Sequence, residues 1–327
     1  MTGRCSCLMF DADLAAEFRT SVAAVLDRGE PAKARAALIE AGWLDALAAD
    51  EAMATAVVFR EQGRTGLDAA ALDDVLAARL GTGEVAVAYP AVPGTHVVLP
   101  AHSEATRLLW VPDLSGAGLM VVDLDGPLEG RPLPGVDSAA GLLGLTERPA
   151  GATTDVAATE WSAALAAGRR ALAHQLVAGA AALLASATAH ARKRRQFGTP
   201  IAGFQAVKHR LAETLVAVSA ADAAAVAAAT AGTQTSAMVA KALAGRAAET
   251  AGRNCFQVFG GIAFTGEHDF HRRYRRGLVL DRLLGNRHAL ERALGARVRA
   301  GDLRGEHLVD LDDLPRVGLD DMRLTTP

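Results

Sequence analysis

Hydrophobic side chains recur at every third or fourth position through residues 11–82. Leu14, Phe18, Val22 and Val25 form one such stripe, and a similar spacing continues through Trp43. This period places the apolar side chains on one face of a helix. The pattern predicts an N-terminal helical domain over residues 11–82, preceded by a flexible N-terminus at residues 1–10.

Residues 83–150 have a different texture, with short β-prone runs separated by glycine, proline and aspartate. Short apolar runs between turn-forming residues are typical of strands. We therefore expect a small antiparallel β domain over residues 83–150. The runs are Val85–Ala88, Val97–Leu99, Leu108–Val111 and Leu119–Val122.

Helical segments rich in alanine and leucine return in residues 151–300. Long helices are predicted at Glu160–Ala191, Gln205–Ala229 and Thr235–Phe256, with a shorter one further on. Alanine and leucine favour helices, and long helices joined by short loops form bundles. The expected fold class is mainly α with a small β domain, ending in a helical bundle over 151–300 and a polar tail over 301–327.

Composition narrows the classes of partner. Half of the residues are hydrophobic (50%), only 4% are aromatic, and the formal net charge is −3. This charge gives no electrostatic attraction to nucleic acid or to an anionic membrane. We see no uninterrupted apolar run of membrane-spanning length and no signal-peptide pattern. The sequence predicts a cytoplasmic protein without a nucleic-acid or membrane partner.

The cysteines and the histidine-containing clusters do not predict a metal site. Cys5 and Cys7 could supply at most half of the ligands that structural zinc uses, and Cys255 lies among apolar helix residues. The cluster at residues 267–271 contains glutamate, aspartate and histidine, but the arginines that follow favour capping and ion pairing. We therefore expect no metal.

A basic run followed by a turn and a helix opens the second bundle segment. It reads Arg194-Arg195-Gln196-Phe197-Gly198-Thr199-Pro200 and continues to Gln205-Ala206. Arginine can bind phosphate oxygens through a planar fork of donors and stays charged. The alternative is a solvated helix end, where cations are favoured by the helix dipole.

A second block reads Gln257-Val258-Phe259-Gly260-Gly261-Ile262-Ala263-Phe264. The first block resembles the R-x-x-F-G-x-x-x-x-x-x-Q-A signature of the acyl-CoA dehydrogenase family. The second resembles that family's Q-x-x-G-G-x-G-(F/Y) block, with Ala263 in place of glycine. The resemblance covers residues 156–295 well. It implies an N-terminal helical domain, a middle β domain and a C-terminal four-helix bundle that mediates dimer contact.

The resemblance also implies the cofactor, FAD, and the acyl-CoA substrate. In the family, residues at the matching positions reach the pyrophosphate and adenosine of a flavin held mainly by the neighbouring subunit. Arginine would supply charged hydrogen bonds there, and paired glycines would let the backbone approach the nucleotide. The implied cofactor contacts are Arg194, Gln196, Phe197, Gln205, Gln257, Gly260 and Gly261.

The catalytic base of the family is missing. In one branch its glutamate falls on Leu284, just before Gly285, and in the other on Gly168, just before Arg169. Neither leucine nor glycine can accept the α-proton. Asp281, His288 and Arg169 are the remaining candidates near these positions. The alternatives are that Asp281 pairs with Arg276 or Arg282 at the surface and that His288 is a solvated helix residue.

The middle segment also departs from the family. Its flavin-covering loops, T-E-x-x-x-G-S and W-I-(S/T), are not visible, and the segment looks short. The resemblance therefore implies a base-lacking subunit of a heteromeric acyl-CoA dehydrogenase. The implied assembly is a homodimer or a heterotetramer with a catalytic chain. Two alternatives stay open. One is a self-sufficient flavoenzyme with a different base or reaction, and the other is a flavin-free structural partner on the same fold.

Overall fold

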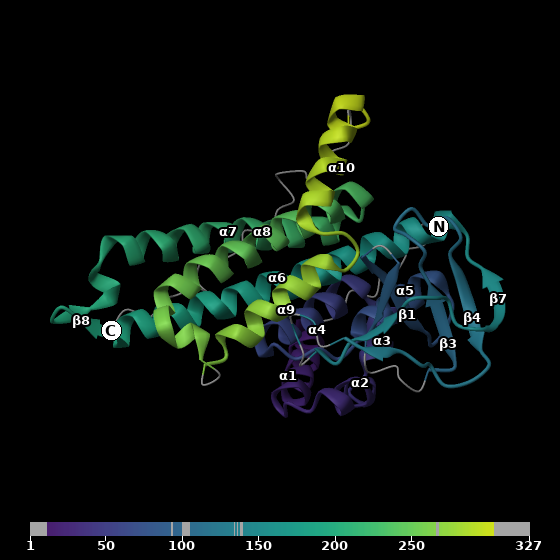
Figure 1. Ribbon diagram of the computed structural model, residues 1–327, viewed down its shortest axis with the longest axis horizontal. Helices are drawn as coiled ribbons and strands as arrows, with labels where there is room; N and C mark the ends of the chain where they lie inside the picture. The colour runs from purple at the N-terminus through teal and green to yellow at the C-terminus, as the bar shows by residue number, and fades with distance from the viewer. Residues whose placement is uncertain are drawn as a thin grey trace, which may run out of the picture.

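The computed structural model describes residues 12–303, apart from residues 93, 100–104, 134, 136, 138–139 and 266–267. Helices occupy the N-terminal part, a sheet follows, and long helices form the rest (Figure 1). The mainly helical fold with a small sheet confirms the predicted fold class. The predicted flexible segment at 1–10 and nearly all of the predicted tail lie outside the described residues.

The N-terminal part contains α1 (Ala12–Asp27), α2 (Pro31–Glu40), α3 (Trp43–Ala49), α4 (Glu51–Thr65) and α5 (Ala71–Leu80). Local signals explain their ends. Pro31 opens α2, where its missing N–H costs nothing. Asp50 caps α4 by accepting from the Met53 N–H at 3.0 Å, and Gly66 ends that helix in the left-handed conformation.

The sheet is mixed and has the order β5-β6-β2-β1-β3-β4-β7. The expectation of a purely antiparallel domain was wrong, because β1 pairs with β3 in parallel while the other neighbours are antiparallel. The last strand, β7, lies wholly after residue 150, the predicted end of the β domain. The strands are β1 (Ala86–Val92), β2 (Thr95–Val98), β3 (Arg107–Trp110), β4 (Met120–Leu124), β5 (Arg131–Pro132), β6 (Leu143–Leu145) and β7 (Gly151–Asp155).

Buried polar contacts fasten the sheet to the N-terminal helices. Asp73 of α5 accepts from the Tyr89 hydroxyl at 2.5 Å and from the Val87 N–H at 3.0 Å, both on β1. The neighbouring Asp74 accepts from Trp43 Nε1 at 3.0 Å and forms an ion pair with Arg35. Burial raises the pKa of Asp73 well above its ordinary value. These satisfied groups fix the central strand β1 of the sheet against the N-terminal helices.

The bundle is built around α6 (Ala158–Lys193), with α7 (Gln205–Ala231), α8 (Gln234–Phe259), α9 (Phe270–Arg282) and α10 (Arg287–Ala300). Most of the residues that α6 and α8 bury are alanines or other small and aliphatic side chains, which let these helices approach closely. Cys255 is fully buried in α8, and burial raises the pKa of its thiol to about 12. In Figure 1, α10 projects away from the other helices, and its Leu290 and Arg297 contact α8.

By length and composition, α6 and α7 would each be long and apolar enough to cross a membrane. This is weak evidence for a membrane segment, because the core helix of a bundle passes the same test. More than half of the apolar window of α6 is buried within the protein (56%), compared with 33% for α7.

A short hairpin and two 3-10 turns complete the bundle end. The strands β8 (Arg195–Gln196) and β9 (Thr199–Pro200) pair antiparallel, and the 3-10 turn η3 (Ile201–Gly203) leads into α7. The second turn, η4 (Gly260–Phe264), follows α8. The hairpin lies at the left tip of the molecule in Figure 1.

Candidate functional site

The two sequence blocks, which are far apart along the chain, meet at one end of the bundle. The first block surrounds the end of α6 and the start of α7, and the second surrounds the end of α8. His190 of α6 and Phe259 of α8 connect them, with ring centroids 5.2 Å apart. Burial lowers the pKa of His190, and its neighbours His268 and Arg194 lower it further.

The predicted cofactor contacts at this end are open to solvent. Arg194, Gln196, Gln205, Gln257 and Gly261 are exposed. The side chain of Arg194 makes no hydrogen bond or ion pair with another described residue, so its guanidinium is available to an outside anion. The run of exposed cations around it also includes Arg192, Lys193 and Arg195.

The turn of the hairpin presents an aromatic ring. Phe197 is 93% exposed and has a φ of 51°, and Gly198 follows with a φ of 78°. Arg195 Nη2 donates to the Gly198 carbonyl at 2.9 Å and stabilises the turn. The exposed ring also lies near Phe204, with ring centroids 6.1 Å apart, so the turn presents a small aromatic surface.

The paired glycines of the second block leave the backbone accessible. Gly260 has a φ of 63°, which favours glycine, and apart from the adjoining chain no described residue has an atom within 4 Å of the position where a Cβ would stand at Gly260 or Gly261. Together, the free guanidinium, the exposed ring and the bare backbone fit the anionic, adenosine-bearing part of a dinucleotide. Their contact with FAD stays a prediction.

The two alternative positions of the family's base lie against each other. A Cβ placed at Gly168 of α6 would lie 2.5 Å from Leu284 Cδ1, 3.0 Å from Leu76 Cδ2 and 3.5 Å from Leu72 Cδ1. Leu284 is 1% exposed, and its φ is 56°. Methyl groups of three leucines thus converge on the bare backbone of Gly168, and we call this group the leucine cage. No proton acceptor stands at either position.

Arg169 lies beside the cage and is 6% exposed. Its Nε donates to the Leu284 carbonyl at 3.0 Å, and its Nη1 donates to Gln234 Oε1 at 3.2 Å. Burial lowers the pKa of Arg169 to about 10. A guanidinium has no lone pair to accept a proton, so it cannot replace the missing base.

Whether Asp281 or His288 could act as a base stays a prediction, and the structure gives each of them a polar neighbour. Asp281 approaches Lys241, with Nζ and Oδ1 3.9 Å apart, and accepts from the Arg287 N–H at 3.3 Å. The expectation that Asp281 pairs with Arg276 or Arg282 was therefore wrong. His288 is exposed and lies 3.9 Å from Glu291, in agreement with a solvated helix residue.

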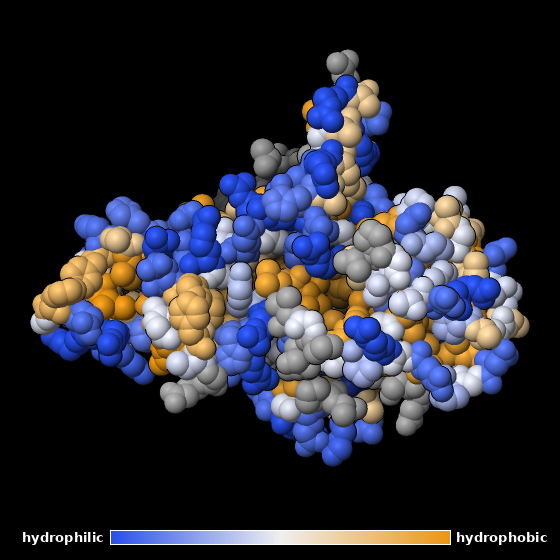
Figure 2. Space-filling view, in the orientation of Figure 1, coloured by the Kyte–Doolittle hydropathy of each residue, from blue (hydrophilic) through white to orange (hydrophobic). Residues whose placement is uncertain are grey.

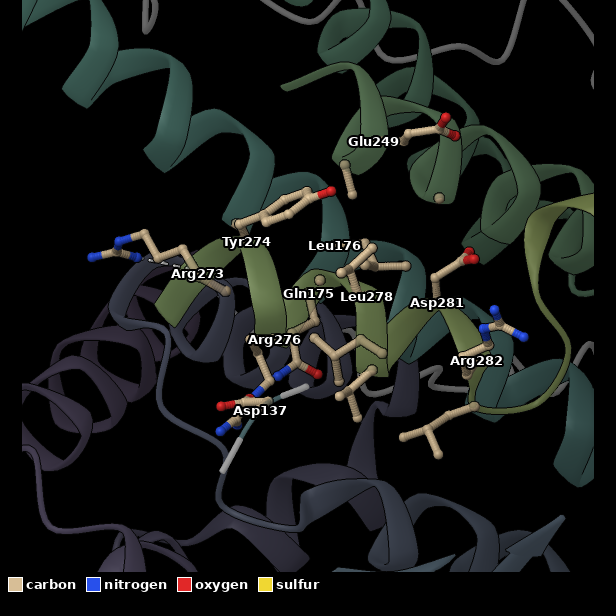
Figure 3. A pocket seen from close by; sticks show the side chains of 18 of the residues that line it. Asp137, Gln175, Leu176, Glu249, Arg273, Tyr274, Arg276, Leu278, Asp281 and Arg282 are labelled. Atoms are coloured by element: carbon tan, nitrogen blue, oxygen red, sulfur yellow. Dashed lines mark hydrogen bonds and ion pairs between the residues drawn. The ribbon is translucent and has the colours of Figure 1, made fainter. Parts of the chain in front are cut away.

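Arg276 forms its ion pairs elsewhere. Its Nε lies 2.6 Å from Asp137 Oδ2, and its Nη1 lies 3.5 Å from Asp68 Oδ2. Asp137 follows β5 in the chain, so this buried pair connects α9 to the β domain (Figure 3). Sequence order had placed Arg276 near Asp281, but the side chain points to the other side of α9.

A cleft of about 520 Å³ runs along α9, between α4, α6, α8 and the β domain. Figure 2 shows an apolar hollow in the middle of this face of the molecule. Glycines and aliphatic side chains form most of the wall, and Figure 3 shows Tyr274, Asp281 and Arg282 on the same helix around it. Leu283 lines this cleft, whereas Leu284 belongs to the leucine cage.

The described residues hold no group of three or more histidine, cysteine, aspartate or glutamate side chains arranged for a metal ion. In the predicted capping cluster, His268 Nδ1 accepts from the Phe270 N–H at 3.0 Å, and Asp269 pairs with Arg272 at 3.5 Å. Glu267 lies outside the described residues.

Sequence reasoning missed Lys241, which is 0% exposed. Its Nζ donates to the Asp281 carbonyl at 3.0 Å and to the Gly285 carbonyl at 3.4 Å. Burial lowers the pKa of Lys241 to about 8; Asp281 opposes this shift and Arg169 adds to it. A lysine within an alanine-rich helix of a chain with so few lysines was the available signal.

Comparison with known proteins agrees with this architecture. Residues 159–298 match the family model described as "Acyl-CoA dehydrogenase, C-terminal domain". The chain is 43% identical over 125 residues to acyl-CoA dehydrogenase FadE34 of Mycobacterium tuberculosis, covering 36% of this chain and 18% of that protein. It is 38% identical over 127 residues to acyl-CoA dehydrogenase IpdE2 of the same organism, covering 39% of this chain and 40% of that protein. The match thus spans less than half the length of either relative.

Solved structures share the fold across most of the chain. A variant of the Tcur3481-Tcur3483 steroid ACAD superposes with a TM-score of 0.73 at 21% identity, covering 89% of this chain and 99% of that chain. The ChsE4-ChsE5 complex of Mycobacterium tuberculosis gives a TM-score of 0.71 at 18% identity, covering 88% and 98%. Residues 159–298 of this chain thus match the C-terminal domain of the acyl-CoA dehydrogenase family, and the overall fold is the fold of these solved structures.

Proposed function

We propose that this chain is the base-lacking subunit of a heteromeric, FAD-dependent acyl-CoA dehydrogenase that removes hydrogen across the α and β carbons of an acyl-CoA thioester. The observation that carries the proposal is the leucine cage. Both positions at which the family places its glutamate meet in one spot, and Leu284 fills that spot against Gly168. The buried Leu284 cannot take the α-proton, and its side chain fills the space that a glutamate carboxylate would occupy.

The bundle end supports a remaining role in cofactor binding. FAD, when bound, supplies the acceptor for the hydride that leaves the β carbon. Arg194 would hold the pyrophosphate, and the open backbone at Gly260 and Gly261 would admit the adenosine side. Phe197, at 93% exposure, would be covered by the nucleotide or by the partner chain.

The partner would supply what this chain lacks. The catalytic chain would contribute the base, the acyl-CoA site and the contacts to the flavin ring. Support for a heteromer comes from the ChsE4-ChsE5 complex, a solved complex with the same fold. The proposal also places the enzyme in the cytoplasm, on the sequence grounds given above.

Co-expression with an acyl-CoA dehydrogenase encoded beside this chain tests the proposal. We expect the two chains to copurify and the complex to show a flavin spectrum and oxidise acyl-CoA. The chain expressed alone should be colourless and inactive. Flavin and turnover in the isolated chain would establish a self-sufficient flavoenzyme instead. A stable complex without any flavin would establish a structural partner.

A further inference from the structure

The turn between α9 and α10 is held by side chains of two other helices. The last carbonyls of a helix have no partner within the helix and need donors from elsewhere. Here, the carbonyls of Asp281, Leu284 and Gly285 accept hydrogen bonds from buried cations. These carbonyls lie at the end of α9 and in the turn that follows it.

Arg169 of α6 holds the middle of the turn. Its Nε lies 3.0 Å from the Leu284 carbonyl, and its Nη1 lies 3.2 Å from Gln234 Oε1 at the start of α8. Gln234 in turn donates to the Ser162 carbonyl of α6 at 3.2 Å. The planar guanidinium is thus fixed in orientation and spans α6, α8 and the turn.

Lys241 of α8 holds both ends of the turn. Its Nζ lies 3.0 Å from the Asp281 carbonyl and 3.4 Å from the Gly285 carbonyl. The Asp281 carboxylate lies 3.9 Å away and also accepts from the N–H that opens α10. One lysine therefore binds carbonyls on both sides of Leu283 and Leu284.

Two glycines make this arrangement possible. A Cβ at Gly245 of α8 would lie 2.2 Å from Asp281 Oδ1, so only glycine lets the carboxylate approach that helix. Gly285 has a φ of 100°, a conformation that other residues rarely adopt. Gly245 and Gly285 thus allow the turn to approach α8 and its buried lysine closely.

Consecutive leucines leave the turn in different directions. Leu283 lines the cleft along α9, and Leu284 enters the leucine cage with a left-handed φ of 56°. That conformation is unfavourable for leucine and persists only where the surroundings impose it. The backbone hydrogen bonds from Arg169 and Lys241 act on the residues that would have to rotate for the two side chains to exchange places.

We propose that Arg169 and Lys241 are positioning residues that fix the α9–α10 turn, so that Leu283 faces the cleft and Leu284 fills the leucine cage. Within the described residues, Lys241 pairs with the Asp281 carboxylate, and Arg169 pairs with no carboxylate. Burying a cation without full charge compensation destabilises the fold. Holding the turn in position is a physical reason for keeping two such cations there. This inference goes beyond the proposed function and does not depend on it.

Cysteine labelling tests the orientation directly in the full chain. Leu283→Cys and Leu284→Cys are prepared separately, and each is treated with methyl methanethiosulfonate. Mass spectrometry of the peptide that contains the turn separates the new thiol from Cys5, Cys7 and the buried Cys255. We expect the thiol at position 283 to react about tenfold faster or more, because it faces the cleft.

Each cysteine variant is then combined with Lys241→Met or with Arg169→Lys. Methionine removes the donor to two carbonyls, and lysine keeps the charge but loses the fork. We expect the protection of the thiol at position 284 to fall about tenfold in both backgrounds, with the urea unfolding midpoint unaffected or raised for Lys241→Met. A general loss of structure would instead lower the midpoint and expose Cys255 as well.

Equal labelling at positions 283 and 284 in the otherwise unchanged chain would overturn the assigned orientation. Labelling that stays different in both backgrounds would overturn the positioning role of the two cations. If Arg169→Lys does not fold, Lys241→Met alone decides the second point. The hydrogen exchange of the turn amides, measured on the same variants without the added cysteines, gives an independent readout.

Discussion

Replacing Leu284 by glutamate tests whether a carboxylate at the family's position could restore a base. The side chain is 1% exposed, and its neighbours at Gly168 are the methyl groups of Leu72 and Leu76. Full burial of a leucine contributes about 1.5–3 kcal/mol. A buried carboxyl group without a partner costs about 1–3 kcal/mol even when neutral. Leu284→Glu should therefore lower the free energy of unfolding by about 2.5–6 kcal/mol.

Leu284→Gln is the matched control, because it has the same size and cannot ionise. Burial among leucines should raise the pKa of the new carboxyl above its unfolded value. The carboxyl is then charged in the unfolded chain and neutral in the folded chain near neutral pH. Stability is consequently lost as the pH rises above about 4, the unfolded pKa. The difference in free energy of unfolding between the glutamate and glutamine variants should therefore increase as the pH rises.

Urea unfolding followed by circular dichroism measures both effects, and an acyl-CoA oxidation assay with added flavin measures rescue. We expect no turnover by the isolated Leu284→Glu chain. Equal stability of the glutamate and glutamine variants at pH 7 would mean that Arg169 reaches the new carboxylate, and the cage argument would fail. Turnover by the isolated variant would refute the claim that position 284 points away from the cleft.

Further outcomes follow from single groups. Arg194→Ala should reduce the flavin retained by the copurified complex, measured from its visible spectrum, whereas Arg192→Ala, in the same exposed run, should not. Burial, followed by the charges of Arg60 and Arg170, lowers the pKa of His174 to about 3. The free energy of unfolding should therefore fall by about 2–3 kcal/mol as the pH is lowered from 7 to 4.5. Urea titrations of His174→Leu should not show that loss. The pKa of Lys241, about 8 in the folded chain against about 10.4 unfolded, means that this group raises stability by up to about 3 kcal/mol as the pH rises through that range. A rise that persists in Lys241→Met would contradict this assignment.

The burial of His174 explains why its protonation should destabilise the fold. It is 2% exposed, and its Nδ1 has no hydrogen-bond partner within the described residues. Arg170 is also buried, and its charge opposes a second positive charge nearby. The unfolded chain binds the proton at a higher pH than the folded chain, so acid favours unfolding.

The sequence by itself predicted most helices and the two family blocks. The spacing of apolar residues along α6, α7 and α8 is a local property, and the helices begin and end within a few residues of the predicted positions. The motifs around Arg194 and Gly260 are equally local. Short-range patterns are reliable because a helix satisfies its backbone hydrogen bonds within itself.

Only the tertiary structure decided which distant groups meet. Sheet pairing joins strands across loops, so the parallel pairing of β1 and β3 could not be read from alternation alone. The partner of Asp281 proved to be Lys241, on a different helix, rather than a neighbouring arginine. Leu284 could be numbered from the motif, yet its direction depends on a left-handed turn held by Arg169 and Lys241. Such contacts arise when whole helices pack together, and the local sequence around each contacting residue does not specify its partner.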